Sequence, residues 1–318
     1  MAHYRGIQAS PAEVLITSGS NQGIELLHEV LLEPGDTVIT ELFTYQGAVS
    51  RMRQHKVNIV GIPLDADGMR MDALASALET LRQRGITPKY IYTIPTLQNP
   101  TGTIMPLERR REMLRLSQEY GVPIFEDECY ADLIWEGEWP QAIRALDTSN
   151  HVLHVGSFSK SLSPSMRLAY FVAPWEVLSR MLACKTDGGT GAMGQLIVAD
   201  FFQNHYEEHM ERLRASMRRK LEAMTAALTT HFGSVVEFQA PRGGMFLWVK
   251  FPEGIDTMKL VAPALKEGIA FNPGPEWATD PDAARNYLRL CYALPSEQQI
   301  GVGIAKLAQV FHREVGIP

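Results

Sequence analysis

The strongest constraint on the fold is a regular alternation, over the first half of the chain, of short apolar runs and longer segments with helical periodicity. The runs, rich in Val, Ile and Tyr, are VLIT at 14, TVIT at 37, VNIVGI at 57, KYIYTI at 89, VPIF at 122, HVLHV at 151 and LAYFVA at 168. The segments between them are long enough to cross over a sheet and connect parallel strands. The pattern predicts an α/β fold in which helices cover a mostly parallel sheet.

The sequence changes character beyond about residue 174, where charged amphipathic segments replace the alternation. The pattern predicts a long helix over about residues 195–230, followed by short strands at SVVEF and GMFLWVKF. We therefore expect a large domain over residues 1–212 and a smaller C-terminal α+β domain over residues 213–318. The long helix would join the two domains.

The composition argues against several classes of protein. Lys and Arg number 30 and Asp and Glu number 36, so the formal net charge is −6, without the basic excess of a nucleic-acid-binding chain. No apolar run approaches the roughly 20 residues of a membrane-spanning helix. The three cysteines are odd in number and lack the spacing of a zinc or redox pair. We expect a cytoplasmic protein with neither nucleic acid nor membrane as a partner, and with no bound metal.

Polar residues collect just after four of the predicted strands. Ligands of an open parallel sheet bind beyond the carboxyl ends of its strands, so these residues are candidates for a site. They are Ser18–Gln22 at a helix start suited to a phosphate, Asn99 in QNPTG, Asp127 in an acidic run, and Lys160 in GSFSK with Arg167 seven residues on. Pyridoxal phosphate (PLP) uses this whole set, because it needs a lysine for a Schiff base, a carboxylate for its pyridine nitrogen, donors for its ring oxygen and a phosphate cradle.

Seven segments resemble, in order and spacing, the fold-type I PLP-dependent aminotransferases, particularly the group that includes the 2-aminoadipate aminotransferases. They are TSGSNQG, ELFTYQGA, PTLQNPTG, FEDECYADL, GSFSKSLSPSMRLAY, PRGGMFLW and YLRLCY, and the resemblance runs from about Ala9 to the C-terminal helix. It implies a transaminase that moves an amino group between an amino acid and a 2-oxo acid by a ping-pong mechanism, with 2-oxoglutarate as the expected acceptor. It also implies a homodimer.

The resemblance assigns three catalytic residues, Lys160, Asp127 and Tyr130. It implies that Lys160 forms the Schiff base with the cofactor and, once released, moves the substrate proton. Asp127 would pair with the pyridine nitrogen, and Asn99 with Tyr130 would bond the ring hydroxyl. The ring of Tyr45 would stack on the pyridine.

The same resemblance assigns the residues that hold the two anionic groups. Ser20 and Asn21, with Ser157 and Arg167, would hold the cofactor phosphate. Arg289 would bind the substrate α-carboxylate with its bidentate fork, which a lysine reproduces poorly. Asn99 would assist Arg289 in the substrate site, where Met245, Trp248 and Trp277 indicate only a tolerance for apolar side chains.

Residue chemistry by itself leaves other interpretations open. Lys160 could be a solvated surface lysine or, as part of SFSK, the lysine of an acyl-serine enzyme, although the partner motifs of that class are missing. The acidic run Glu126–Glu128 could be a divalent metal site. Arg289 could form a buried ion pair, and Tyr45 could be ordinary packing. The contacts of each side chain distinguish these alternatives.

Only 17 residues precede Ser18, whereas the resembling family usually has several dozen residues ahead of this motif. Either the start codon is placed late or the chain is a natural truncation, and for the chain as given we expect PLP binding with poor transamination. An alternative function is a non-catalytic PLP-binding sensor module. Such modules occur in transcriptional regulators that fuse a winged helix to this fold.

Overall fold

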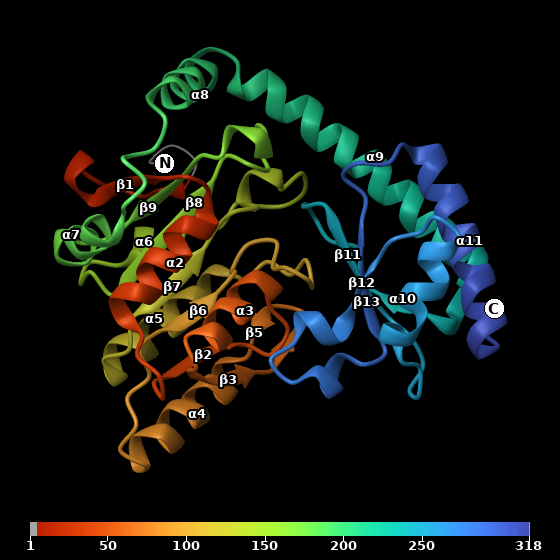
Figure 1. Ribbon diagram of the computed structural model, residues 1–318, viewed down its shortest axis with the longest axis horizontal. Helices are drawn as coiled ribbons and strands as arrows, with labels where there is room; N and C mark the ends of the chain where they lie inside the picture. The colour runs from red at the N-terminus through yellow and green to blue at the C-terminus, as the bar shows by residue number, and fades with distance from the viewer. Residues whose placement is uncertain (1–4, 318) are drawn as a thin grey trace.

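A seven-stranded sheet forms the frame of the larger part of the protein in the computed structural model, which describes residues 5–317 (Figure 1). The strand order is β1-β9-β8-β7-β6-β2-β3. Each of the seven expected runs overlaps one of these strands: β1 (Val14–Thr17), β2 (Thr37–Glu41), β3 (Asn58–Ile62), β6 (Ile91–Thr93), β7 (Ile124–Asp127), β8 (Val152–Ser157) and β9 (Ala169–Val172). Strands β2, β7 and β8 extend one or two residues beyond their runs. Every neighbouring pair is parallel except the two that involve β9. The expected mostly parallel α/β sheet is thus confirmed.

Strand β9 runs antiparallel to both of its neighbours, which the alternation of runs did not predict. The connection from β8 to β9 covers residues 158–168 and contains only a turn and the short 3-10 helix Pro164–Met166. That segment is too short for a helical crossover, so the chain returns along the sheet in the opposite direction. The turn carries Lys160 and Arg167, and the reversal leaves both at the carboxyl end of β8.

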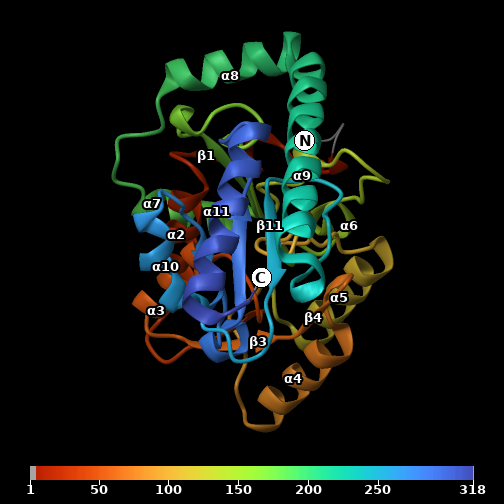
Figure 2. The ribbon, with the colours of Figure 1, turned by 90° about the vertical axis from the view of Figure 1, so that its right-hand side faces the viewer.

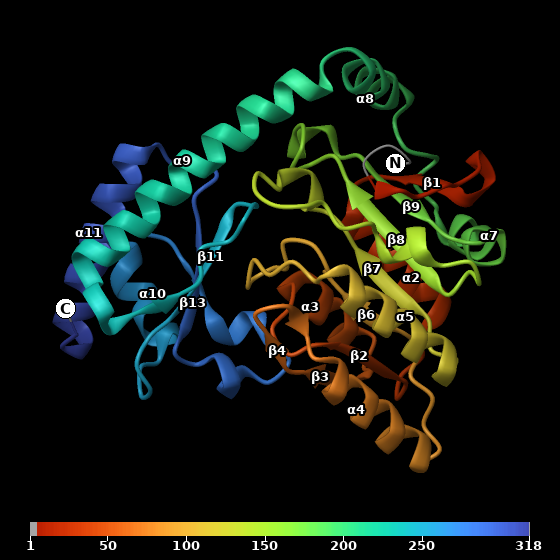
Figure 3. The ribbon, with the colours of Figure 1, turned by 180° about the vertical axis from the view of Figure 1, so that it is seen from behind.

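Helices cover both faces of the sheet, and each face has its own hydrophobic core (Figures 1 and 3). One face carries α2 (Ser20–Leu31), α3 (Gln46–Gln54) and α7 (Trp175–Cys184), and the other carries α4 (Met71–Gln83), α5 (Leu107–Tyr120) and α6 (Ile143–Leu146). Strands β2 and β8 are buried along their whole length, as strands between two helical layers must be. A small hairpin of β4 (Leu64–Asp65) and β5 (Gly68–Met69) precedes α4.

The expected continuous helix over about residues 195–230 is wrong, because the structure divides it into two helices. Helices α8 (Ala192–Asn204) and α9 (Tyr206–Phe232) meet at His205, whose φ of −133° is not helical. Tyr206 and Met210 are buried against the main core, whereas α8 buries only Val198. Burial therefore fixes the start of α9 to the main core, whereas α8 lies at the top of the view in Figure 2 with most of its residues exposed.

A second sheet and core follow in the C-terminal part. The antiparallel sheet has the order β10-β11-β13-β12 and comprises β10 (Glu237–Phe238), β11 (Phe246–Lys250), β12 (Asn272–Pro273) and β13 (Tyr287–Cys291). It packs with α9, α10 (Thr257–Lys266) and α11 (Glu297–Val315). The remaining 3-10 helices are Pro11–Glu13, Ala131–Leu133, Gly233–Val235, Gly274–Trp277 and Pro281–Ala284.

The two cores meet along α9. Met210 belongs to the first core, Met217 belongs to the second, and the partly buried Leu213 packs against both. This change of core supports the boundary between 1–212 and 213–318, which stays a proposal. No helix among residues 5–317 has both the length and the apolar character needed to cross a membrane.

We predict that Phe311→Ala destabilises the C-terminal part by about 3–5 kcal/mol, the usual cost of removing a buried aromatic ring. Phe311 is fully buried, with ring centroids 4.4 Å from Phe251 and 5.7 Å from Phe232. Guanidinium denaturation followed by tryptophan fluorescence measures the change. The control Val302→Ala lies on the same helix with a half-exposed side chain and should cost less than about 0.5 kcal/mol. Equal costs for the two variants would contradict the proposed packing of α11.

Candidate active site

The carboxyl ends of the parallel strands border a cavity of about 220 Å³. Its lining includes residues from β7, β8, the start of α2 and the C-terminal sheet. All of the sequence-predicted site residues line this one cavity: Ser20, Asn21, Tyr45, Asn99, Asp127, Tyr130, Ser157, Lys160, Arg167 and Arg289. Residues as far apart in the chain as Ser20 and Arg289 are therefore brought together.

One end of the cavity collects groups that bind anions. Helix α2 begins at Ser20, directly after Gly19, and its first backbone N–H groups and positive dipole end point outward. Gly19 has a φ of 86°, and a Cβ there would lie 2.3 Å from Arg167 Nη2. Only glycine therefore allows the Arg167 guanidinium to lie against the helix start. With the hydroxyl of Ser157 in the same lining, these donors fit a phosphate group.

Asp127 presents a carboxylate that is buried without a counter-ion. It ends β7, and it accepts hydrogen bonds from Tyr92 Oη at 2.8 Å and from the Cys129 backbone N–H at 3.2 Å. Among residues 5–317, no cationic side chain forms an ion pair with it. Burial raises the pKa of Asp127, and the hydrogen bonds oppose this rise. A protonated ring nitrogen is the kind of ligand group that would stabilise this carboxylate.

The two acidic neighbours of Asp127 point elsewhere and do not form a metal site with it. Glu126 accepts hydrogen bonds from the Ile143 backbone N–H and, at 2.8 Å, from His154 Nδ1. Glu128 Oε1 lies 3.1 Å from Arg110 Nη1 in a fully buried ion pair. Alternation along the strand explains why only the middle carboxylate lines the cavity, so the metal interpretation of this run is not supported.

Tyr130 and Asn99 form a hydrogen-bonded pair on another wall of the cavity. Asn99 Nδ2 donates to Tyr130 Oη at 3.1 Å, and burial raises the pKa of Tyr130, so the phenol stays neutral. Lys160 Nζ lies 5.9 Å from the centre of the Tyr130 ring. Lys160 is therefore a residue of the cavity lining and not a solvated surface lysine.

Arg289 is a buried cation that reaches the cavity from β13. Its guanidinium carbon lies 3.8 Å from the Phe246 ring centre and 3.5 Å from that of Trp277. Nη1 donates to Asn99 Oδ1 and Nη2 to Asn272 Oδ1, each at 2.8 Å, while Nε is buried without a partner. Burial lowers the pKa of Arg289 to about 10, which still leaves it protonated at neutral pH.

Arg289 does not form the buried ion pair that the sequence left open. No carboxylate lies within ion-pair distance of Arg289 in the described part of the chain, and its contacts are amide oxygens and aromatic faces. A buried arginine held in this way is stabilised by an incoming carboxylate. Its environment fits a ligand that carries such a group.

Tyr45 packs at the edge of this site with a polar contact. It is the residue before α3, its Oη donates to Asn21 Oδ1 at 3.3 Å, and its ring centre lies 6.2 Å from that of Trp277. Trp277 lines the cavity as the sequence indicated, but Met245 and Trp248 are outside its lining. Trp248 instead stacks on Tyr287, with ring centroids 5.2 Å apart.

Sequence reasoning missed several residues that shape the site. Tyr92, which donates to Asp127, lies inside a predicted strand, and its alternation with Ile91 was the only available signal. Phe246 and Asn272, which contact Arg289, lie in the C-terminal sheet. Their partnership depends on a strand register that pairs Asn272 with Arg289. No local motif carries that information.

Comparisons with known proteins agree with this geometry. The family model described as Aminotransferase class I and II matches residues 1–307. Aromatic-amino-acid aminotransferase 1 of Thermococcus litoralis is 33% identical over 312 residues, which cover 97% of this chain and 75% of that protein. An uncharacterised HTH-type transcriptional regulator of Bacillus subtilis is 33% identical over 305 residues, which cover 95% of this chain and 62% of the regulator.

A solved structure is similar over nearly the whole chain. It is the α-aminoadipate aminotransferase of Thermus thermophilus in complex with N-(5'-phosphopyridoxyl)-L-leucine, and the TM-score is 0.90 at 32% identity. The match covers 96% of this chain and 78% of that one. The cavity described above has the donors, the buried carboxylate and the lysine that a phosphopyridoxyl group requires. The chain therefore belongs to the class I and II aminotransferases and is a PLP-dependent transaminase.

Proposed function

We propose that PLP lies in this cavity between the start of α2 and the side chain of Asp127. The proposal rests on one observation. The same cavity contains a group of anion-binding donors at one end and the buried Asp127 carboxylate, which has no counter-ion among the described residues. Ser20, Asn21, Ser157 and Arg167 would hold the phosphate. The helix start supplies backbone donors and Arg167 supplies charge, so the phosphate would be bound by both.

The bound cofactor supplies a pyridinium ring that withdraws electrons from the substrate carbon. Asp127 keeps the ring nitrogen protonated, because a buried carboxylate strongly favours a cationic partner. Tyr92 and the Cys129 N–H hold that carboxylate in one orientation. Asn99 and Tyr130 would bond the ring oxygen, and the ring of Tyr45 would cover one face of the pyridine.

Lys160 is the proposed covalent attachment residue and the base for proton transfer. Among residues 5–317, its Nζ is the one lysine amine in the lining of the cavity. The free amine of Lys160 would accept the proton from the substrate α-carbon and donate it in turn to the cofactor, which is the proton transfer that a transaminase requires. The ring centre of Tyr130 lies 5.9 Å from this amine.

Arg289 is the proposed binding residue for the substrate α-carboxylate, with Asn99 as its fixed partner. An amino acid and a 2-oxo acid both carry this carboxylate, so one arginine serves both halves of a ping-pong reaction. We propose 2-oxoglutarate as the acceptor. The aromatic walls of Phe246, Trp277 and Tyr45 support donors with apolar side chains.

The sensor-module alternative explains less of the cavity. A sensor module needs the contacts to the cofactor, whereas a transaminase also needs a group that binds the α-carboxylate shared by all of its substrates. Arg289 and Asn99 are in hydrogen-bond contact at 2.8 Å, and this pair supports substrate turnover.

The three cysteines are free, in agreement with the proposed cytoplasmic location.

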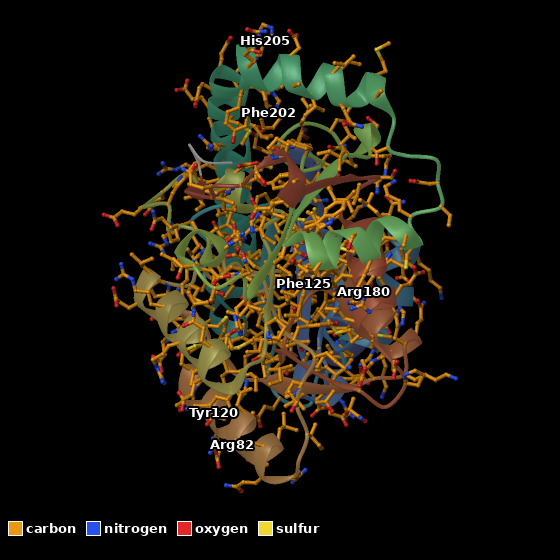
Figure 4. The ribbon with its side chains drawn as sticks, turned by 90° about the vertical axis from the view of Figure 1, so that its left-hand side faces the viewer. Arg82, Tyr120, Phe125, Arg180, Phe202 and His205 are labelled. Carbon is orange, nitrogen blue, oxygen red and sulfur yellow. The ribbon has the colours of Figure 1, made fainter. Side chains whose placement is uncertain are left out.

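We propose further that a second copy of the chain covers the apolar face of α8. Met193, Leu196 and Ile197 on this helix are 72%, 67% and 50% exposed. Beneath α8 lies a cavity of about 800 Å³, lined in part by Phe202, which Figure 4 labels together with His205 at the corner between α8 and α9. An exposed apolar surface of this kind supports an association between proteins.

The α8 cavity adjoins the PLP cavity, which supports a shared role. Ser157 lines both cavities. A partner seated under α8 would therefore contact the end of β8, next to the proposed phosphate site. In our proposal, Ser157 links formation of the homodimer to the structure of the active site.

Borohydride reduction of the PLP-loaded protein tests the proposed function. We expect the reduced cofactor to become fixed to the peptide that contains Lys160, because this is the only lysine in the described lining of the cavity. Mass spectrometry of the digest locates it. Lys160→Ala should lose both the attachment and transamination, whereas the control Lys250→Ala, whose side chain is 37% exposed, should keep both. Attachment to Lys185 or Lys250 would refute the assignment.

Arg289→Lys should weaken transamination of every amino acid donor by a similar factor. The α-carboxylate is common to all donors, and loss of a desolvated bidentate contact costs on the order of 2–5 kcal/mol. The measurement is kcat/KM over a panel of acidic, aromatic and aliphatic donors. Arg285→Lys, an exposed arginine paired with Asp282, is the control and should leave the values unchanged. A loss restricted to acidic donors would place Arg289 at the side-chain carboxylate instead.

Leu196→Glu should convert the proposed dimer into a monomer, because it places a charge in an apolar interface. Sedimentation equilibrium gives the molar mass of wild type and variant. Val302→Glu is the matched control, because it introduces the same charge at another exposed apolar residue, which is 54% exposed on α11. A monomeric wild type, or equal dissociation of both variants, would refute the proposed interface.

A further inference from the structure

Helices α2 and α3, which lie side by side in front of the sheet in Figure 1, bring three potential metal ligands together outside the active-site cavity. Glu25 and His28 are separated by about one turn of α2, and His55 directly follows the last residue of α3. One ligand atom from each of the three lies within 4.8 Å of the other two. Glu25 Oε1 and His55 Nε2 are 3.4 Å apart.

His28 provides the independent observation that points to a ligand. Its side chain is fully buried, its Nε2 lies 2.9 Å from Tyr90 Oη, and its Nδ1 has no hydrogen-bond partner. With Nε2 engaged by Tyr90, Nδ1 is the atom that His28 can offer to the cluster. A buried polar atom without a partner is costly, so a ligand bound at Nδ1 would stabilise the folded chain.

We propose that Glu25, His28 and His55 bind a divalent transition-metal ion of the Zn²⁺ class. Two imidazoles and one carboxylate are a ligand set that suits such ions. In a tetrahedral zinc site, bonds of about 2.0–2.1 Å place neighbouring ligand atoms ~3.3–3.4 Å apart. The 3.4 Å between Glu25 Oε1 and His55 Nε2 has this length.

Tyr90 completes the arrangement behind His28. A metal-bound histidine usually donates its second ring N–H to an oxygen, which fixes its tautomer. If His28 Nε2–H donates to Tyr90 Oη, the lone pair of Nδ1 is free for the ion. The His28 and His55 rings meet edge to face, with centroids 5.5 Å apart. The two imidazoles therefore approach the ion from different directions.

Arg51 pairs with the second carboxylate oxygen of Glu25, and the proposed metal site is accessible from solvent. Arg51 Nε lies 3.4 Å from Glu25 Oε2, and Arg51 is also bonded to the Gly47 carbonyl. It therefore orients the carboxylate so that Oε1 is directed to His55. The side chains of Glu25 and His55 are 40% and 20% exposed, which gives an ion a route from solvent. A simple Glu25–His55 ion pair would not account for the unpartnered Nδ1 of His28.

The ion would have a structural role distinct from transamination. It would join α2 to the end of α3, and the opposite ends of these helices carry Asn21 and Tyr45, which are hydrogen-bonded at 3.3 Å. The pair of helices would then be connected at both ends. This inference does not depend on the proposed roles of the active-site residues.

The test is a Co²⁺ titration of the untagged, PLP-loaded protein after dialysis against a chelator. We expect one equivalent of Co²⁺ to bind with the visible absorption of a low-coordinate site, and Zn²⁺ to displace it. Glu25→Gln and His55→Ala should each weaken binding at least tenfold, whereas Glu29→Gln, an exposed glutamate on the same helix, should not. Tyr90→Phe should weaken binding 10- to 100-fold, as loss of an outer-shell hydrogen bond typically does.

Thermal unfolding gives a second readout that does not involve catalysis. Zn²⁺ should raise the melting temperature of the wild type and of Glu29→Gln, but not that of His55→Ala. Because the His55 side chain is partly exposed, we expect the His55→Ala variant to fold. Absence of Co²⁺ binding to the wild type would overturn the proposal. Equal binding to wild type, Glu25→Gln and His55→Ala would also overturn it, because the ion would then lie elsewhere.

Discussion

The burial of the Asp127 carboxylate at the end of β7 is the constraint on which the active site depends. An ionised carboxylate without a counter-ion is unfavourable in a protein interior, and the hydrogen bonds from Tyr92 and Cys129 only partly offset this. The two acidic neighbours of Asp127 already have partners of their own, because Glu126 bonds His154 and Glu128 pairs with Arg110. The charge that remains is directed at the cavity.

Arg289 is the opposite case on the facing wall. It is a buried cation whose contacts are two amide oxygens and two aromatic faces, so it too lacks a counter-ion among the described residues. A ligand with a cationic ring at one end and a carboxylate at the other would satisfy Asp127 and Arg289 together. The polarity of the cavity thus selects the orientation of what binds there, before any contact with the substrate side chain.

The strands and the residues at their ends could be predicted from the sequence, because both follow from local pattern. Asn99, Asp127 and Lys160 each come directly after an apolar run, and a parallel sheet places all such positions at one edge. The break at His205 could not be predicted, because both flanking segments are helical and the bend depends on burial of the following side chain. The stacking of Trp277 on Arg289 was also hidden, since it depends on tertiary packing.

Two backbone hydrogen bonds help to set the distance between the opposite charges of Asp127 and Arg289. The Thr44 N–H donates to the Trp277 carbonyl and the Thr279 N–H donates to the Leu42 carbonyl, each at 2.9 Å. They attach the segment that carries Trp277 to the end of β2, directly before Tyr45. Since Trp277 stacks on Arg289, any movement of the C-terminal sheet that shifts Arg289 must also strain this attachment. Main-chain contacts to the sheet edge that borders the cavity therefore help to position Arg289, the proposed substrate-binding residue, and α9 does not do so alone.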